Sequence, residues 1–424
     1  MSRPAAIAVV AAIAVIAGRP SRAAGSPLEL FGFGGRSPAM AGTGAGDSDS
    51  FDSAYLNPAG LAGVSARRVS VGYLVGDYAL ELDGDETDTA RPSALVFGAA
   101  LPLPLGGALR DRVGIGLGFI TPTAALVRVR VPFPGDPTYS LLETRSQTLG
   151  ILVAGGVRVT DRLRLGGGIL ALAALRGYIF VDADGAGRFS SDSEQRLVTH
   201  FAPVAGATYD LDWRDARAGL TFRGASRSEY HIDVTNELAD DLPLTLPTLQ
   251  IAGVAHYDPL TVDAEVGARL ADGLRGYALL SYQRWSAYPL PTENPVLSAP
   301  PQESPGFHDT VRPHLGVEHE RRALGGDLSV RGGYAFLWSP APEMTGRQSL
   351  LDNHRHMFSV GAGLAWPDAV VPMHVDVWTQ VHVLQPRKHR KDPDAFAEDD
   401  PLPFDRVSTK GHILVGGVMA GVDL

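Results

Sequence analysis

The sequence predicts an all-β fold, a transmembrane antiparallel β-barrel of about 14 strands with an N-terminal plug, the hatch, in its lumen. Three observations support this prediction. They are a secretory signal peptide, strands whose side chains alternate with period two, and connections that alternate between short and long. Residues 1–23 are expected to form the signal peptide, 24–66 the hatch and 67–424 the barrel.

The N-terminus has the three parts of a signal peptide. Arg3 provides a positive charge, residues 5–18 are an apolar run, and Ser21 and Ala23 occupy the small-residue positions of a cleavage site. The apolar run is shorter than the ~20 residues that a membrane-spanning helix needs. The chain is therefore expected to be exported through the inner membrane and cleaved.

After the signal peptide, apolar stretches have the length of strands. The longest uncharged one, residues 165–175 between Arg164 and Arg176, is about eleven residues, and a tilted membrane strand needs ~9–11. Residues 113–119 alternate apolar residues with glycine, and residues 69–73 and 375–378 also alternate. In a helix each of these glycines would cost up to ~1 kcal/mol relative to alanine. In a barrel wall the alternation separates the lipid face from the lumen face.

The same pattern divides the chain into fourteen predicted strands. They are residues 67–80, 93–102, 112–121, 147–159, 162–181, 196–210, 215–233, 247–270, 274–285, 311–319, 327–337, 356–366, 372–384 and 409–422. The eighth contains Asp258-Pro259, where proline removes a ladder N–H. It is kept as one long or bulged strand because an odd number would leave the C-terminus on the wrong side of the membrane.

Connection lengths favour a barrel over a soluble sandwich. Connections after even-numbered strands are short, such as residues 160–161, whereas those after odd-numbered strands include the long segments 122–146, 286–310 and 385–408. Outer-membrane barrels have short periplasmic turns and longer extracellular loops, and a sandwich gives no reason for such alternation.

Composition excludes several classes of protein. With 424 residues, no Cys and a formal net charge of −10, the chain has no disulfide framework, no thiolate site and no basic footprint for nucleic acid. The run Gly42–Gly46 lacks the preceding strand and the spacing of a nucleotide fingerprint, and no Gly-x-Ser-x-Gly elbow is present. No cofactor, no metal site and no enzymatic activity are expected, because the histidine pairs also lack a metal-binding pattern; these pairs are His354/His356 and His374/His382.

Residues 24–66 do not alternate like strands. A glycine- and alanine-rich run over 31–46 leads to Asn57, Pro58, Ala59 and Gly60, followed by Leu61. This segment resembles the hatch of the FadL-type long-chain fatty-acid transporters of the bacterial outer membrane. Leu246-Pro247, residues 282–288 and residues 331–334 resemble later blocks of the same family in the same order.

The resemblance implies a fourteen-stranded barrel closed by the hatch. It also implies passive uptake of long-chain fatty acids or other small hydrophobic compounds through a groove among the loops and a lumen site at the hatch. The exit is then sideways through the third strand, where a distortion is expected near Thr121-Pro122. The expected ligand-binding residues are Leu28, Leu30, Phe31, Phe33, Phe119, Arg128, Arg130 and Phe133, the two arginines as partners for a carboxylate. The expected lateral-opening residues are Gly114, Gly116, Gly118 and Pro122.

Two questions remain open in the sequence. The basic run 387–391 suits either contact with lipopolysaccharide phosphates or a solvated loop. A barrel of this kind also suits a second function, a protein-secretion or interaction scaffold. A monomer is expected, and Leu424 replaces the aromatic residue with which such barrels usually end. Aromatic residues near strand ends, such as Trp213, Trp285 and Trp338, are expected to form interfacial girdles.

Overall fold

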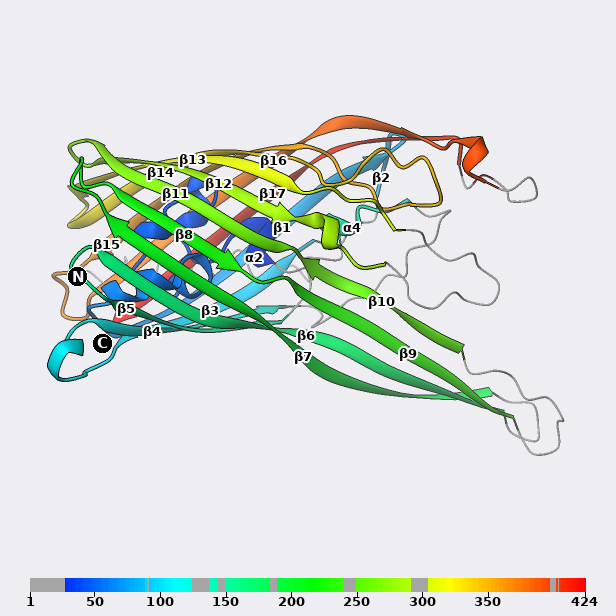
Figure 1. Ribbon diagram of the computed structural model, residues 1–424, viewed down its shortest axis with the longest axis horizontal. Coiled ribbons are helices and arrows are strands. Elements are labelled where there is room, and N and C mark those ends of the chain that lie inside the picture. Colours follow the sequence, from blue (N-terminus) through cyan, green and yellow to red (C-terminus); the bar gives the residue numbers. More distant parts are fainter. Residues whose placement is uncertain are drawn as a thin grey trace.

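The computed structural model describes residues 27–87, 89, 91–123, 137–143, 149–183, 189–238, 249–290, 304–396, 402 and 404–424. Within them fourteen antiparallel strands form a closed barrel, which confirms the predicted fold class (Figure 1). The first strand closes the wall by pairing with the last, from Arg68 opposite Asp423 to Leu82 opposite Thr409. The expected signal peptide, residues 1–23, lies outside the described residues.

The strand bounds follow the predicted alternation closely. The wall strands are β1 (Arg68–Leu82), β3 (Ser93–Pro102), β4 (Val113–Pro122), β5 (Gly150–Arg158), β6 (Leu163–Ala183), β7 (Phe189–Asp210), β8 (Arg217–Arg223), β11 (Leu260–Ala271), β12 (Leu274–Arg284), β13 (Thr310–Ala323), β14 (Gly326–Leu337), β15 (Arg355–Trp366), β16 (Met373–Arg390) and β17 (Arg406–Asp423).

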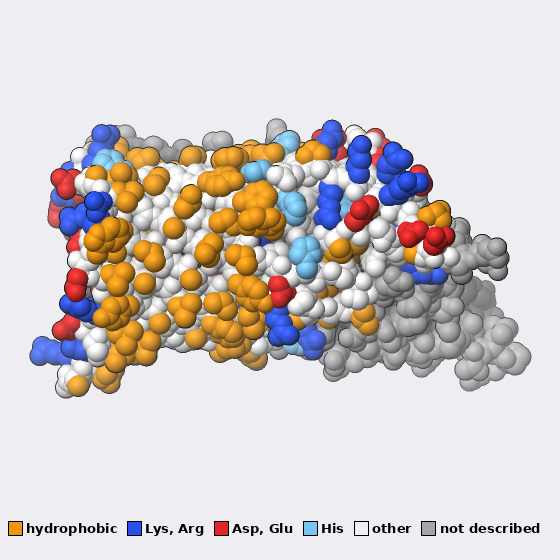
Figure 2. Space-filling view, turned by 45° about the horizontal axis from the view of Figure 1, so that its top comes forward, with side chains coloured by type: hydrophobic (Ala, Val, Ile, Leu, Met, Phe, Trp, Pro, Cys, Tyr) orange, Lys and Arg blue, Asp and Glu red, His pale blue; other side chains and the backbone are white. Residues whose placement is uncertain are grey.

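Period-two alternation separates the two faces of this wall. In β1, Val69 and Val71 are exposed on the outside, while Ser70 is buried on the inside. Apolar side chains cover the outer surface in a band, and charged side chains gather at both ends of the barrel (Figure 2). This is the surface that a strand-built membrane protein presents to lipid.

The two ends of the barrel differ. Short turns join β5 to β6, β7 to β8, β11 to β12 and β13 to β14 at one end, called here the short-turn end, where the C-terminus also lies (Figure 1). Longer connections gather at the other, the long-loop end. No helix among the described residues has the length and apolar character needed to cross a membrane.

The predicted seventh and eighth strands each divide into two. β8 stops at Arg223, and β9 (Ser226–Leu238) then runs parallel to the outer part of β6. β10 (Leu249–Asp258) pairs with β9, and the chain re-enters the wall as β11 after Pro259. The unbroken strand predicted over 247–270 is therefore wrong, because the missing proline N–H ends one ladder and begins another. The barrel count is unchanged, since β9 and β10 extend beyond the wall at the long-loop end (Figure 1).

The aromatic girdle is only partly as expected. Trp338 and Trp213 are exposed near opposite ends of the barrel. Trp285 is instead fully buried, where its Nε1 donates to Gln283 Oε1 at 3.0 Å and its ring lies against Phe307. It belongs to the interior of the long-loop end and not to a girdle.

The N-terminal segment lies inside the barrel as a series of short helices (Figure 1). These are α2 (Pro27–Phe31), η1 (Ser37–Met40), η2 (Ala45–Asp47), α3 (Ser53–Leu56) and η3 (Pro58–Gly63). η3 contacts β4 to β7, η2 contacts β8 and β11, and η1 contacts β13 to β16. The segment therefore reaches the wall on all sides.

The remaining elements are short. They are β2 (Asp85–Glu86), η4 (Gly107–Leu109), α4 (Ser140–Glu143), η5 (Trp285–Ala287) and η6 (Pro393–Ala395).

The inner surface of the wall has two unlike halves. The apolar half consists of β17, β1 and β3 to β7. Away from the short-turn end its inward side chains include Leu74, Val96 and Ile120. The charged half consists of β8 and β11 to β16, whose inward side chains include Glu265 and Arg331. The hatch lies between these two surfaces and contacts both.

Candidate functional site

The Asn57–Gly60 motif fixes the hatch to the wall. Asn57 Nδ2 donates to the carbonyl oxygens of Ala207 and Leu220, which belong to the paired strands β7 and β8, at 3.2 and 3.3 Å. Its Oδ1 accepts the N–H of Ala59 at 3.1 Å and so caps η3. One side chain thus satisfies backbone groups of both the hatch and the barrel.

Glycines of β3 and β4 face the hatch across the apolar half. These residues, Gly98, Gly114, Gly116 and Gly118, are called here the glycine window. A Cβ atom on Gly118 would lie 2.7 Å from Phe33 Cζ, and one on Gly116 would lie 2.7 Å from Leu61 Cδ2. The ring of Phe51 lies against Gly98 in the same way, 5.2 Å from the ring of Phe33. At the window, only the backbone of the wall separates hatch side chains from the outside.

The window is closed in this structure. β4 pairs with β3 from Gly114 to Pro122 and with β5 from Val113 to Ile120, and neither ladder has a register shift. Thr123 N–H still donates to Ser93 O at 3.1 Å beyond Pro122. On the β3 side the expected distortion near Thr121-Pro122 is therefore absent, while on the β5 side the ladder ends at Ile120, directly before these residues. The glycines of β4 admit the hatch at close range instead of bending the strand.

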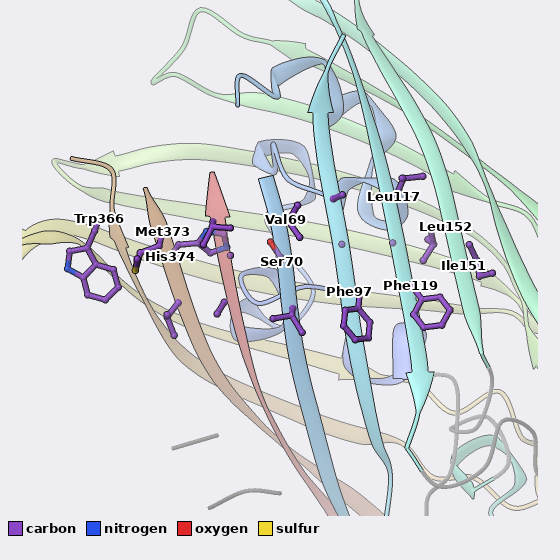
Figure 3. A pocket seen from close by; sticks show the side chains of 18 residues that line it. Val69, Ser70, Phe97, Leu117, Phe119, Ile151, Leu152, Trp366, Met373 and His374 are labelled. Carbon is purple, nitrogen blue, oxygen red and sulfur yellow. The ribbon is translucent and has the colours of Figure 1, made fainter. Parts of the chain in front are cut away.

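Phe119 does not face the lumen. The alternation that turns Gly118 and Ile120 inward turns Phe119 outward, where its ring lies 6.1 Å from that of Phe97. Both rings line an apolar groove of about 790 Å³ on the outer surface, over the glycine window (Figure 3). The predicted ligand residue Phe119 therefore lies on the lipid face, apart from Leu28, Leu30 and Phe31 in the lumen.

Charged groups hold the hatch on the opposite side. Glu265 of β11 accepts the N–H groups of Gly44 at 2.7 Å and Gly46 at 3.0 Å. Gly44 has a positive φ of 86°, which turns successive N–H groups toward one anion. Asp47 accepts from Arg217 Nη1 at 3.1 Å. The glycine run of the hatch is therefore an anchor for a wall carboxylate and not a nucleotide site.

A buried ion-pair chain continues this anchor. Arg36 Nε donates to Glu318 Oε1 at 3.0 Å, and Arg331 Nε donates to the same oxygen at 2.7 Å. Arg331 also pairs with Asp376. Glu318 is only 2% exposed, so these arginines replace the water that its carboxylate would otherwise need.

Asp52 is a buried acid within the hatch itself. It is 5% exposed, and its Oδ1 accepts the Ser48 hydroxyl at 2.6 Å. Burial raises the pKa of the Asp52 carboxyl, while the hydrogen bond from Ser48 opposes that rise in part.

A lumen cavity of about 90 Å³ lies beside α2, and three of the predicted ligand residues line it. Leu28 and Leu30 are buried in its wall with Phe31. Phe33 does not reach the cavity, since it packs against the glycine window. The structure thus brings together the first three residues and places Phe33 deeper in the hatch.

The other side of the cavity is polar. Arg312 Nη1 donates to Glu29 Oε1 at 3.0 Å, and Gln283 Nε2 donates to the same oxygen at 2.7 Å. Arg223 pairs with Asp263 a short distance away. Each of these acids is therefore paired with an arginine.

Arg355 adds a cation that these pairs leave unbalanced. It is 3% exposed and lines the cavity from the start of β15. Its Nε and Nη1 atoms have no hydrogen-bond partner among the described residues. A buried charge without a partner costs several kcal/mol, so this guanidinium is a candidate for an anionic group of a ligand. Sequence reasoning missed Arg355, which lies between two histidines at a strand boundary and belongs to no recognisable motif.

The predicted loop site cannot be placed. Arg128, Arg130 and Phe133 lie outside the described residues. The basic run 387–391 is partly an internal brace. Lys391 Nζ donates to Gly346 O at 2.5 Å, and Arg387 Nη1 donates to Ala341 O at 2.6 Å.

Apolar loop residues close the described part of the long-loop end, a feature that the sequence did not reveal. Tyr139 and Leu142, beside and within α4, are completely buried. Leu350 forms a backbone bridge with Thr138. The interior therefore continues as an apolar cluster from these loops to the lumen wall.

The histidines do not gather. His382 lies against Phe31 with ring centroids 6.0 Å apart, and His356 stacks on Tyr334 at 6.1 Å. Among the described residues no group of three or more metal-ligating side chains is close enough to hold an ion.

Comparison with known proteins gives one family. A model of the family described as outer membrane protein transport protein (OMPP1/FadL/TodX) matches residues 13–383. A search of curated proteins finds no significant sequence match.

Solved structures with the same fold are similar over nearly the whole chain. A FadL homologue of Pseudomonas aeruginosa has 13% identity and a TM-score of 0.62, covering 96% of this chain and 99% of its own. The toluene transporter TodX of P. putida has 11% identity and a TM-score of 0.55, covering 93% and 99%. The toluene transporter TbuX of Ralstonia pickettii has 14% identity and a TM-score of 0.52, covering 92% and 99%.

Proposed function

Because the chain belongs to the OMPP1/FadL/TodX family of outer-membrane transport proteins, we propose that it passively carries small hydrophobic compounds, long-chain fatty acids among them, across the bacterial outer membrane. The short-turn end is then periplasmic and the long-loop end extracellular. We expect the barrel to act as a monomer among lipopolysaccharide molecules.

The observation that carries the fatty-acid proposal is the lumen cavity with its unbalanced arginine. A carboxylate can accept charge-assisted hydrogen bonds from the Arg355 guanidinium. Leu28, Leu30 and Phe31 are adjacent and suit the start of an acyl chain, which gains about 0.8 kcal/mol for each buried CH₂. A cavity of about 90 Å³ does not hold a whole acyl chain, so the hatch must shift when ligand enters.

The proposed exit is sideways through the glycine window. A lateral path keeps an acyl chain out of water, whereas the short-turn mouth is lined by charged residues such as Asp47, Arg217 and Asp376. Because β4 pairs with β3 from Gly114 to Pro122 and with β5 from Val113 to Ile120, opening at the window requires the hatch rings to withdraw and part of a ladder to separate.

Ligand binding to the purified full-length barrel tests this proposal. The ligands are oleate, methyl oleate and toluene, and the variants are Arg355→Leu and a matched control at the exposed Arg321. Loss of a charge-assisted contact of ~1.5–3 kcal/mol predicts roughly 10- to 100-fold weaker oleate binding in Arg355→Leu. Methyl oleate and the Arg321→Leu control should be almost unaffected.

Two results would contradict the proposal. Equal loss of all three ligands in Arg355→Leu would indicate a purely structural arginine. A wild-type barrel that binds none of them, and carries no hydrophobic compound when extracted, would favour the scaffold function.

A further inference from the structure

A large apolar groove lies on the lipid-facing surface over the glycine window. It runs across the outward faces of β5, β4, β3, β1, β17 and β16 (Figure 3). Its volume of about 790 Å³ falls within the ~300–1,000 Å³ range of small-molecule sites. A second outer hollow, beside Leu280 and Trp338 on β12 to β14, measures about 340 Å³.

Small residues between large ones create the groove. Ala99 and Ala420 lie on its outward face, and their cross-strand neighbours Leu117 and Val71 project above them. Phe97 and Phe119 form a ridge along one side. The result is an elongated apolar trough, a shape that suits an aliphatic chain.

The groove runs obliquely across the wall. On β4 and β5 it reaches toward the long-loop end, since Phe119 is three residues from the end of β4 at Pro122 and Ile151 is the second residue of β5. On the other strands it lies near the short-turn end. Val69 is the second residue of β1, which starts at that end, and Met373 begins β16 just after a short turn. Ala99 is three residues from the last residue of β3, Pro102, which also lies there. In the membrane the end of the groove on β1 and β16 therefore lies in the periplasmic leaflet, whereas its end on β4 and β5 lies farther from the periplasmic surface.

The groove and the hatch share one layer of backbone. Gly98 and Gly118 form part of the groove floor, and on the inside the same residues contact Phe51 and Phe33. No side chain of the wall stands between those rings and the groove at these two positions. A chain leaving the lumen here would pass directly into the trough.

We propose that this groove is a binding site for the aliphatic chain of the transported compound after it leaves the lumen, on the lipid-facing surface of the wall. The inference rests on the proposed function. It adds a defined landing site, from which the trough leads toward the short-turn end and the periplasmic, phospholipid leaflet.

Photolabelling of the full-length protein in phospholipid nanodiscs tests the proposal. The probe is palmitate with a diazirine on its chain, and a phosphatidylethanolamine with the same diazirine chain serves as the bulk-lipid probe. Mass spectrometry should find palmitate labels at Val69, Phe97 and Leu117 that excess oleate removes at least tenfold. Labels beside Leu280 should not respond to oleate.

Groove-filling variants separate this site from the lumen site. Ala99→Phe and Ala420→Phe should reduce groove labelling at least tenfold, while Ala278→Phe, an outward alanine on β12, should not. Labelling beside Leu28 in the lumen should persist in all three, because none of these residues faces the interior. Two independent alanines keep the test valid if one variant fails to assemble.

The outcomes are distinguishable. Groove labels that oleate does not remove, and that the phospholipid probe reproduces equally, would overturn the landing site and leave ordinary lipid contact. Lumen labelling without groove labelling would overturn the landing site while supporting the proposed function. Groove labelling that oleate removes, without any lumen labelling, would support the site and contradict the route through the lumen.

Discussion

The two halves of the lumen wall hold the same hatch by opposite means. On the apolar half, glycines bring Phe33, Phe51 and Leu61 against bare backbone. On the charged half, Glu265 and Glu318 hold backbone N–H groups and arginines. The apolar contact is non-directional and can reform after sliding, whereas the ion pairs fix one position.

This difference assigns the halves different roles. An acyl chain can replace Phe33 or Phe51 at the window without leaving polar groups unsatisfied. It cannot replace Arg36 at Glu318, because the buried carboxylate would lose one of its two arginine partners and gain no hydrogen-bond donor. The hatch is therefore expected to pivot on its charged side and to yield on its apolar side. The variants below test that division, in decreasing order of expected effect.

Removing the ring of Phe33 should have the largest effect on the contact between the hatch and the apolar half. Phe33→Ala leaves a cavity behind the window, and such truncations cost ~3–5 kcal/mol. Hydrogen exchange of backbone amides in residues 27–63 should show the loss of protection. The lipid-facing Phe97→Ala is the matched control and should leave those amides unchanged; equal deprotection by both would mean that the ring contributes nothing specific to the hatch.

Breaking the ion-pair chain should loosen the charged side. Glu318→Gln leaves Arg36 and Arg331 facing each other, which we expect to cost ~2–3 kcal/mol, below the 3–5 of a fully dry pair because Arg36 is 22% exposed. Denaturant titration of the hatch amides measures the change. The exposed pair of Arg322 with Asp327 is the control, since Arg322→Ala should cost under ~1 kcal/mol. Comparable losses in both variants would contradict a special role for the buried chain.

Loss of the hydrogen bonds of Asn57 should destabilise the hatch less than either of these changes. Asn57→Ala removes the cap of η3 and two hydrogen bonds to wall carbonyls, for a cost of ~1–2 kcal/mol. Amides of residues 58–63 should exchange faster than those of 37–47. Uniform deprotection of the whole hatch would show that Asn57 acts globally.

Asp52 should give the hatch a mild pH dependence. A carboxyl whose pKa is raised on folding binds its proton more tightly in the folded state. The protection of hatch amides should therefore be greatest below the ordinary pKa of an aspartate and should fall as the pH rises through the raised value. Asp52→Asn should remove that fall, and a variant that keeps it would assign the pH dependence to another group.

The sequence predicted the barrel well because its signals are local. Alternation at residues 113–119 and short turns such as 160–161 depend on neighbours in the chain, so strand count and most bounds were correct. Alternation alone does not say which set of side chains faces the lumen, so it left the orientation of Phe119 open. The glycines on either side of it were the available clue.

The site was less predictable because its parts meet only when the barrel closes. Arg36 and Glu318 are 282 residues apart, and Arg355 becomes a buried cation only through its place in the wall. Asp258-Pro259 had a local signal for a break, but the even strand count outweighed it. Two extra strands beyond the wall satisfy both conditions, a solution that the sequence pattern alone did not suggest.

The most direct test of the division between the halves is to map where a hydrophobic ligand travels. Diazirine-palmitate should be photoactivated in the full-length barrel during uptake, and the labelled residues identified by mass spectrometry. Labels on inward residues of the apolar half, such as Leu80, Ile120 and Leu152, with few on Ser281 or Ser329, are the predicted result. Labels distributed equally over both halves would contradict a dedicated apolar route.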